Sequence, residues 1–231
     1  MSLSQQLAAQ HLTNNPEIKA VLFDLDGTLV DTAPDLIEAL NLSLNDAGFE
    51  RQSPEFIRPF ASHGSMAMVN AAILHANEDI KANVRQGLLE HYLRINGQQS
   101  QLFDGIAALL TQLKRKGLPV GIVTNKPARF ARPLIHALGL TDQFGCIISG
   151  DSTLHPKPHT APMLLAAQQI AVAPAHILYL GDALRDLQAA RNANMQGGIA
   201  LWGYLARDDE PASWPSEYQF NSAFEVTALF S

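Results

Sequence analysis

The sequence predicts an α/β protein, with a doubly wound parallel sheet and a separate helical block inserted after the first strand. Five short apolar runs, each bounded by turn or helix signals, are typical of strands buried on both faces. Helical patterns lie between these runs, and such alternation predicts parallel βαβ crossovers. From residue 32 to about residue 100, by contrast, the sequence shows helical patterns only. An insertion into the sheet-forming chain accounts for this interruption.

The elements of the sheet-forming part follow from local patterns. The five apolar runs predict strands at 20–23, 120–123, 146–148, 177–180 and 198–202. One helix is expected where Ile106, Leu109 and Leu113 share a face, and Gly117 ends it. Two more helices are expected over 162–170 and 186–193. We assign residues 1–31 and 101–231 to this core.

The inserted block contains three helical stripes. The first consists of Leu36, Leu40 and Leu44, which recur at a spacing of four between a start at 32–34 and a stop at Gly48. Two later stripes have similar helical spacing; they are Met66, Val69, Ile73 and Ala76, and then Ile80, Val84, Leu88 and Tyr92. We therefore assign residues 32–100 to a small helical domain.

The composition is that of a globular protein, and it argues against two classes of partner. With 231 residues, 47% of them hydrophobic and 16% charged, the chain can bury a sizeable core. Its net charge is −6 and it has no Lys/Arg-rich run, whereas a nucleic-acid-binding surface needs a basic patch. No segment approaches the length of an apolar membrane span, so we expect no membrane partner.

The cysteine content and the N-terminus predict a location in the cytoplasm. Cys146 is the single cysteine and lies in an apolar run, which is typical of a small buried side chain in a reducing compartment. Residues 1–16 have neither a basic start nor a sustained apolar stretch, so we expect no signal peptide. We expect these residues to form a loose tail or an added helix.

Two acids, Asp24 and Asp26, directly follow the first expected strand. Ligands bind at the carboxyl ends of the strands of a doubly wound sheet, and Gly27 permits the backbone to bend there. The pair is therefore a candidate active site. Asp-Gly is also a strong hairpin signal, so a simple tight turn remains an alternative, although the following residues have a helical pattern.

Polar residues follow the other strands as well. Thr124 and Asn125 either cap a helix or hold phosphate oxygens at its N-terminus. Lys157 is followed and preceded by prolines, which fix its loop and could present a cation to a phosphoryl group; otherwise it is a solvated charge. Asp182 and Asp186 either cap the next helix, or Asp182 ligates a hard cation with Asp186 ordering the site behind it.

Taken in order, these motifs resemble those of the haloacid dehalogenase (HAD) superfamily. The pattern is Asp-x-Asp-Gly-Thr at 24–28, a strand ending in Thr124, then Lys157-Pro158, then Gly-Asp-x-x-x-Asp at 181–186, and it covers essentially the full chain. The resemblance implies a Rossmann-like core in which the motifs converge on one pocket. It also implies that residues 32–100 form a mobile helical C1 cap.

The resemblance implies a reaction that begins with attack on phosphorus by Asp24. An aspartyl-phosphate would form, and Asp26 would act first as acid and then as base. The Asp24 carboxylate, the Asp26 main-chain carbonyl and Asp182 would hold a magnesium ion (Mg²⁺), which offsets the repulsion between nucleophile and phosphate.

Other positions would bind the transferred phosphate. By the same resemblance, Thr124 and Asn125 would hold its oxygens and Lys157 would add a second positive charge. Asp186 would order the waters of the metal or the lysine.

The implied activity is magnesium-dependent hydrolysis of a small organic phosphate monoester, by a monomer or homodimer. Asp26 argues against hydrolytic dehalogenation, because a halide leaving group needs no proton. A sugar phosphomutase and a non-catalytic phosphosugar sensor are less favoured alternatives. The sensor would lack at least one of Asp24, Asp26, Lys157 and Asp182, and all four are present.

Two branches of the superfamily are similar to this chain. Residues 124–134 and 157–159 resemble phosphoglycolate phosphatases. The same segments, with 184–186 and 202–204, resemble N-acetylmuramic acid 6-phosphate phosphatases of bacterial wall recycling. Either substrate would place the enzyme in carbohydrate metabolism.

The cap is expected to choose the substrate. Ser62, His63 and Gly64 are the candidate substrate-binding loop, with a simple turn and Ser65 as helix N-cap as the alternative. Two positions depart from the superfamily pattern: Ala183 stands where a small polar residue is usual, and Asn194 where a glycine is usual.

Overall fold

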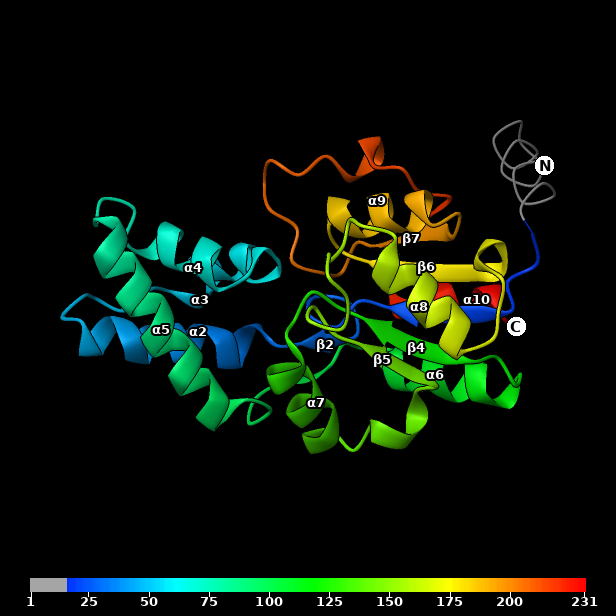
Figure 1. The fold of residues 1–231 in the computed structure, drawn as a ribbon, viewed down its shortest axis with the longest axis horizontal. Coiled ribbons are helices and arrows are strands. Elements are labelled where there is room, and N and C mark those ends of the chain that lie inside the picture. The colour runs from blue at the N-terminus through cyan, green and yellow to red at the C-terminus, as the bar shows by residue number, and fades with distance from the viewer. Residues whose placement is uncertain (1–15) are drawn as a thin grey trace.

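The computed structural model describes residues 16–231, so the tail expected over 1–16 lies outside the described part except for Pro16. Its centre is a six-stranded sheet with helices on both faces, and a helical block stands beside the sheet (Figure 1). The strands are all parallel and lie in the order β5-β4-β1-β6-β7-β8. Their bounds are β1 Ala20–Phe23, β4 Val120–Val123, β5 Cys146–Ile148, β6 Ile177–Gly181, β7 Gln196–Ala200 and β8 Tyr218–Phe220.

The strand order reverses at β1, which places a ligand-binding crevice there. From β1 the chain adds β4 and β5 on one side, then returns to add β6, β7 and β8 on the other. A crevice opens at the carboxyl ends of the strands at such a switch point. The carboxyl ends of β1, β4 and β6 therefore lie side by side at this crevice.

The sheet is buried on both faces, as its apolar strands predict. Val21 and Phe23 of β1 pack on one face, and Ala20 and Leu22 pack on the other, because successive side chains of a strand alternate. Helices α6 (Ile106–Arg115), α7 (Ala128–Ala137) and α10 (Ala223–Leu229) supply side chains to the first face. Helices α8 (Ala161–Gln169) and α9 (Leu184–Asn192) supply side chains to the second.

The inserted block is helical and has its own apolar core. It consists of α2 (Ala33–Asp46), α3 (Pro54–Ile57), the 3₁₀ helix η1 (Arg58–His63), α4 (Ser65–Ala72) and α5 (Glu78–Ile95). Its core contains all three residues of the first stripe and five of the eight later ones. These stripe residues are Leu36, Leu40, Leu44, Val69, Ile73, Val84, Leu88 and Tyr92. We call these helices the cap.

Two linkers join the cap to the core, and they pair with each other. Strands β2 (Val30–Asp31) and β3 (Gln101–Leu102) form a short antiparallel ribbon. Behind it, the buried Asp35 carboxylate accepts hydrogen bonds from the backbone N–H groups of Gly97, Gln99 and Ser100. The outgoing helix and the returning chain are therefore tied together.

The sequence predicted most of these elements, with some shifts. The doubly wound fold class is confirmed. The last predicted strand, 198–202, begins two residues earlier and ends at Ala200. Glycine weakens a strand pattern, but Gly198 is needed because a Cβ there would lie 2.6 Å from a Leu180 methyl carbon. The second cap stripe forms a helix only as far as Ala72.

The remaining short elements had no clear periodic signal. They are the strands β2, β3 and β8 and the helices α3 and α10. The 3₁₀ helices η1, η2 (Thr141–Gln143), η3 (Pro174–His176) and η4 (Pro211–Ser213) also belong to this group. Within residues 16–231, no helix combines the length and the apolar character that crossing a bilayer requires.

Candidate active site

Three acidic side chains meet at the switch point of the sheet. Asp24 follows β1, and Asp182 follows the neighbouring strand β6, with Asp186 in the first turn of α9. Oxygen atoms from the three carboxylates lie within 4.8 Å of one another, and all three side chains are buried. Thr124, at the end of β4, lines the same cavity as Asp24. The strand-end residues that the sequence singled out are thus brought together.

The turn after β1 is shaped by Gly27. Its φ is +81°, a conformation that favours glycine, and a Cβ would collide with the Asp182 carboxylate. The chain then continues through β2 into α2 and does not return beside β1 as a hairpin. The Asp26-Gly27 pair is therefore a turn, and its glycine packs against the acidic cluster.

Lys157 provides the buried positive charge of this cluster. Its Nζ lies 3.1 Å from Asp24 Oδ1 and 2.7 Å from Asp186 Oδ1, and it donates to Val123 O at 2.9 Å. The side chain is fully buried. The Tyr179 hydroxyl, 2.7 Å from Nζ, also donates to Val123 O. This tyrosine was not among the predicted site residues, although its polar end in a buried strand required a partner.

Asn125 holds the lysine loop in place. Its Nδ2 donates to Lys157 O, and its Oδ1 accepts from Lys157 N, each at 2.9 Å. Both polar atoms of the side chain are thus used to position Lys157, and the second N–H group of the amide remains for the phosphate contact that the sequence suggested. Thr124 Oγ1 accepts from Lys126 N at 3.1 Å, which leaves its hydroxyl hydrogen for another acceptor.

Burial makes the acidic cluster difficult to ionise without a cation. It raises the pKa of Asp182 to about 7, with Asp186 and Asp24 adding to the effect. Burial also raises the pKa of Asp24 to about 6, although Lys157 opposes the rise. Burial alone would raise the pKa of Asp186 too, but Lys157 and Arg185 hold it below its ordinary value.

The donor set fits a hard divalent cation. In residues 16–231, Asp182 has no lysine or arginine within ion-pair distance, and Asp186 is already engaged by Lys157 and by Ala183 N at 3.0 Å. Asp182 is therefore the carboxylate without a neutralising partner, and beside it lies Asp24, which shares Lys157 with Asp186. Magnesium prefers oxygen ligands of this kind. Asp186 contacts Lys157, which is the lysine that the sequence analysis expects it to order.

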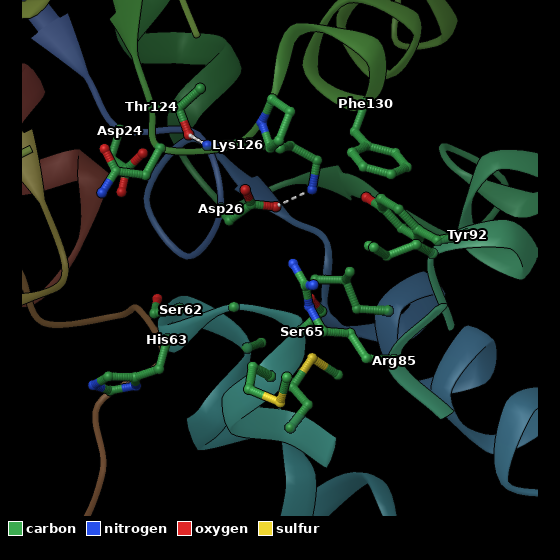
Figure 2. A pocket seen from close by; sticks show the side chains of 18 of the residues that line it. Asp24, Asp26, Ser62, His63, Ser65, Arg85, Tyr92, Thr124, Lys126 and Phe130 are labelled. Carbon is green, nitrogen blue, oxygen red and sulfur yellow. Dashed lines mark hydrogen bonds and ion pairs between the residues drawn. The ribbon is translucent and has the colours of Figure 1, made fainter. Parts of the chain in front are cut away.

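Asp26 has a different environment from Asp24. Its Oδ1 accepts from Thr32 Oγ1 at 2.5 Å and from Lys126 Nζ at 2.8 Å, so the side chain is held away from the acidic cluster (Figure 2). Lys126 Nζ also lies 4.6 Å from the centre of the Tyr92 ring. Burial would lower the pKa of Lys126, but Asp26 and Tyr92 raise it above its ordinary value. Sequence reasoning missed this lysine.

A cavity of about 480 Å³ lies between the core and the cap. Asp24 and Asp26 line it from the core, and the loop Ser62, His63 and Gly64, our candidate for substrate binding, lines it from the cap. Figure 2 shows Asp24 and Thr124 at one side, with Tyr92 and Phe130 at the other. The cap loop also touches the acidic cluster, because Ser62 Oγ donates to Asp182 Oδ2 at 2.7 Å.

The turn before α4 differs from the alternative that the sequence left open, a simple turn with Ser65 as helix N-cap. Gly64, with φ +85°, is the N-cap residue, and Ser65 is the first helical residue. Ser65 does not cap the helix; its hydroxyl instead accepts a hydrogen bond from Arg85 Nε at 3.1 Å.

Tyr204 links the acidic cluster to the cap linker. Its backbone N–H donates to Asp182 Oδ2 at 2.9 Å. Its hydroxyl accepts from the backbone N–H groups of Thr32 and Ala33 and donates to Asp31 Oδ1 at 2.7 Å. The sequence of segment 202–204 indicates only a resemblance to one branch of the superfamily, and no local pattern predicts this structural role.

The two departures from the superfamily pattern have local explanations. Ala183 needs no polar side chain to hold Asp186, because its backbone N–H donates to Asp186 Oδ2. Asn194 has a φ of +58°, and asparagine is among the residues that tolerate this left-handed region.

Comparisons with known proteins agree with this geometry. A family model described as haloacid dehalogenase-like hydrolase matches residues 21–199. The chain is 41% identical over 199 residues to the phosphoglycolate phosphatase of Xanthomonas campestris pv. campestris (strain 8004), which covers 86% of this chain and 90% of the relative. It is 36% identical over 210 residues to the N-acetylmuramic acid 6-phosphate phosphatase of Pseudomonas putida, covering 90% and 94%.

A solved structure shares the whole architecture. The crystal structure of a predicted phosphoglycolate phosphatase from Haemophilus somnus 129PT matches with a TM-score of 0.83 and 26% identity, and it covers 94% of this chain and 99% of that one.

Proposed function

This chain belongs to the haloacid dehalogenase-like hydrolases, and from that premise we propose that it is a phosphatase that hydrolyses a small organic phosphate monoester. One observation carries the proposal. Asp24 lines a cavity beside the fully buried Lys157 and lies close to Asp182, which could ligate a metal ion. Asp26 lines the same cavity and is held by Lys126. These contacts support the assignment of a nucleophile, a cation, a metal ligand and a proton carrier to one site.

Asp24 is the proposed nucleophile. Its carboxylate oxygen forms a bond to phosphorus while the bond from phosphorus to the leaving oxygen breaks, which gives an aspartyl-phosphate. Lys157 balances part of the charge that gathers there, because it contacts the same carboxylate. Water then attacks the phosphorus and releases phosphate and free Asp24.

Asp26 is the proposed proton carrier. It gives a proton to the departing oxygen in the first step and takes one from the attacking water in the second. Its contacts with Lys126 and Thr32 fix the carboxyl group at the cavity wall. A halide leaving group would need no such acid, so Asp26 also supports a phosphatase over a dehalogenase.

We propose that Mg²⁺ is held by the carboxylates of Asp24 and Asp182 and by the main-chain carbonyl of Asp26. When bound, it supplies positive charge that lets a dianionic phosphate approach an anionic nucleophile. Thr124 would donate its hydroxyl hydrogen to a phosphate oxygen. Residues 1–31 and 101–231 would form the catalytic core and residues 32–100 the cap that covers it.

Two substrates are candidates. Phosphoglycolate is favoured by the name of the relative at 41% identity. N-acetylmuramic acid 6-phosphate is favoured by the cavity, because about 480 Å³ exceeds what a two-carbon ester fills and lies in the range of sites for larger ligands. Either reaction would belong to carbohydrate metabolism, and the buried, unpaired Cys146 supports our expectation of a cytoplasmic enzyme.

Phosphate release tests the proposed function. The protein is incubated with phosphoglycolate, N-acetylmuramic acid 6-phosphate and a panel of sugar phosphates, with Mg²⁺ or with a chelator. We expect release from at least one of the two acids with Mg²⁺, and loss of that release with the chelator. A protein that hydrolyses none of these esters, or that is indifferent to the chelator, would contradict the proposal.

The binding of Mg²⁺ should also depend on pH. Folding raises the pKa of Asp182 to about 7 and that of Asp24 to about 6, so the metal-free folded state binds more protons than the unfolded chain between about pH 4 and 7. These groups therefore make the metal-free protein less stable as pH rises through this window. Because Mg²⁺ binds the ionised carboxylates, it should stabilise the fold more at pH 8 than at pH 5.5.

Thermal unfolding measures this difference. At a hundredfold excess of Mg²⁺ over its Kd, the gain is about 2.7 kcal/mol at pH 8. Asp182→Asn should lose most of the gain, whereas Asp142→Asn, an exposed change of the same kind, should keep it. An equal gain at both pH values, or in the Asp182 variant, would contradict the assigned ligands.

A further inference from the structure

We propose that Arg85 binds a second anionic group of the substrate, a carboxylate, on the cap side of the cavity. The inference rests on the proposed function, because it concerns the other end of the molecule whose phosphate meets Asp24. It assigns a residue that selects the substrate and that lies outside the motifs and loop described above.

Arg85 is oriented toward the cavity by a neighbour in the cap. It belongs to α5, lines the same cavity as Asp24, and donates from Nε to Ser65 Oγ at 3.1 Å. Figure 2 shows its guanidinium directed toward the side of the cavity on which Asp26 and Lys126 lie. Since Nε is used by Ser65, the two terminal NH₂ groups remain as a fork, which matches the two oxygens of a carboxylate.

The charge of Arg85 is not balanced by the protein. Lys157 pairs with Asp24 and Asp186, and Lys126 pairs with Asp26. Arg185 lies 4.0 Å from Asp24, at the end where the phosphate is expected. For Arg85, no carboxylate stands within ion-pair distance anywhere in residues 16–231. Arg85 is solvent-exposed at the cavity wall, and in a protein of net charge −6 an oriented and unpaired cation at that place would attract an anion locally.

Arg129 is the rival for this role. It also lines the cavity, but its guanidinium stacks 4.7 Å from the centre of the neighbouring Phe130 ring. No side-chain hydrogen bond within the described chain orients it. Arg85, which a hydroxyl group holds, is the better preorganised of the two.

The lining of the cavity suits a carbon skeleton between two anionic ends. Apolar and aromatic side chains make up much of the wall; they include Leu36, Met66, Met68, Leu89, Tyr92 and Phe130. Both candidate substrates carry a carboxylate in addition to the phosphate. The chemistry that Arg85 would recognise is therefore common to them, and the experiment must separate them.

Two matched pairs of esters isolate the carboxylate. N-acetylmuramic acid 6-phosphate differs from N-acetylglucosamine 6-phosphate by the lactyl group that bears the carboxylate, and phosphoglycolate differs from ethyl phosphate by its carboxylate in place of a methyl. For each pair, kcat/KM is measured with Mg²⁺ and expressed as the ratio of the acid to its partner. In Arg85→Gln this ratio should fall at least about tenfold for the pair that holds the true substrate, chiefly through KM.

A conservative variant and two arginine controls complete the test. Arg85→Lys, which keeps the charge without the fork, should restore part of the ratio. Arg94→Gln removes an exposed arginine that does not line the cavity from the same helix, and it should leave the ratio unchanged. An unchanged ratio in Arg85→Gln, or a fall that appears equally in Arg94→Gln or only in Arg129→Gln, would overturn the assignment.

The outcome also separates this inference from the function on which it rests. If the wild-type protein hydrolyses no phosphate ester of the panel with Mg²⁺, the proposed function fails; if it hydrolyses other esters but neither acid, only the assignment of Arg85 fails. If the wild type hydrolyses one of the acids and the kcat/KM ratio is the same in Arg85→Gln, only the assignment of Arg85 fails. The pair of esters whose kcat/KM ratio falls in Arg85→Gln contains the true substrate.

Discussion

Replacing Asp24 by asparagine is expected to lower kcat by about ten-thousandfold or more, because loss of a nucleophile removes the covalent route and not merely one contact. The folded state should survive, since burial already disfavours the charge of Asp24 and raises its pKa to about 6. Phosphate release under saturating substrate and Mg²⁺, with the midpoint of thermal unfolding, measures both effects.

Two further variants distinguish loss of the nucleophile from loss of the negative charge. Asp24→Glu keeps a carboxylate that can ligate a metal, but the added methylene moves its oxygen out of line, so we expect it to be nearly as inactive as Asp24→Asn. Asp142→Asn makes the same chemical change at an exposed position and should retain full activity. Substantial turnover in Asp24→Asn would show that another group attacks the phosphorus.

The placement of the core residues could be predicted because it depends on a simple regularity. Asp24, Thr124 and Asp182 each follow an apolar strand, and parallel strands align their carboxyl ends at one edge of the sheet. No long-range contact needs to be known for this argument. The order of the strands, which puts β1 between β4 and β6, then brings the residues together.

The residues that were missed depend on contacts between distant parts of the chain. Lys126 reaches Asp26 across 100 positions, and Tyr204 reaches Asp31 across 173. No local pattern specifies such pairs. Arg85 faces the cavity because of the way α5 is rotated about its axis and packed in the cap, and the apolar stripe of that helix fixes the rotation only approximately.

Asn125 shows a third reason for incomplete prediction. Its position at a strand end suggested phosphate binding, and the structure adds a second role, because its amide group holds the backbone N–H and C=O groups of Lys157. A polar side chain near a site can bind the ligand or position a residue that does. The residue type and spacing are the same in both cases, so only the three-dimensional arrangement decides.

Replacing Lys157 by methionine is expected to lower kcat/KM by about a hundred- to a thousandfold, because the site loses the charge that stabilises the transferring phosphoryl group. It should also destabilise the fold by about 3–5 kcal/mol, since Asp24 and Asp186 would be left as buried carboxylates without their partner. Steady-state kinetics and denaturant unfolding, carried out with Mg²⁺ present, measure the two losses.

The double variant Lys157→Met with Asp186→Asn distinguishes these losses. It removes one charge of each sign from the cluster, so much of the lost stability should return, while the loss of activity should persist. If stability and activity recovered together, Lys157 would act only by maintaining the fold. If activity alone stays low, the buried cation acts on the phosphoryl group, and its contact with Asp24 is part of the chemistry and not only of the packing.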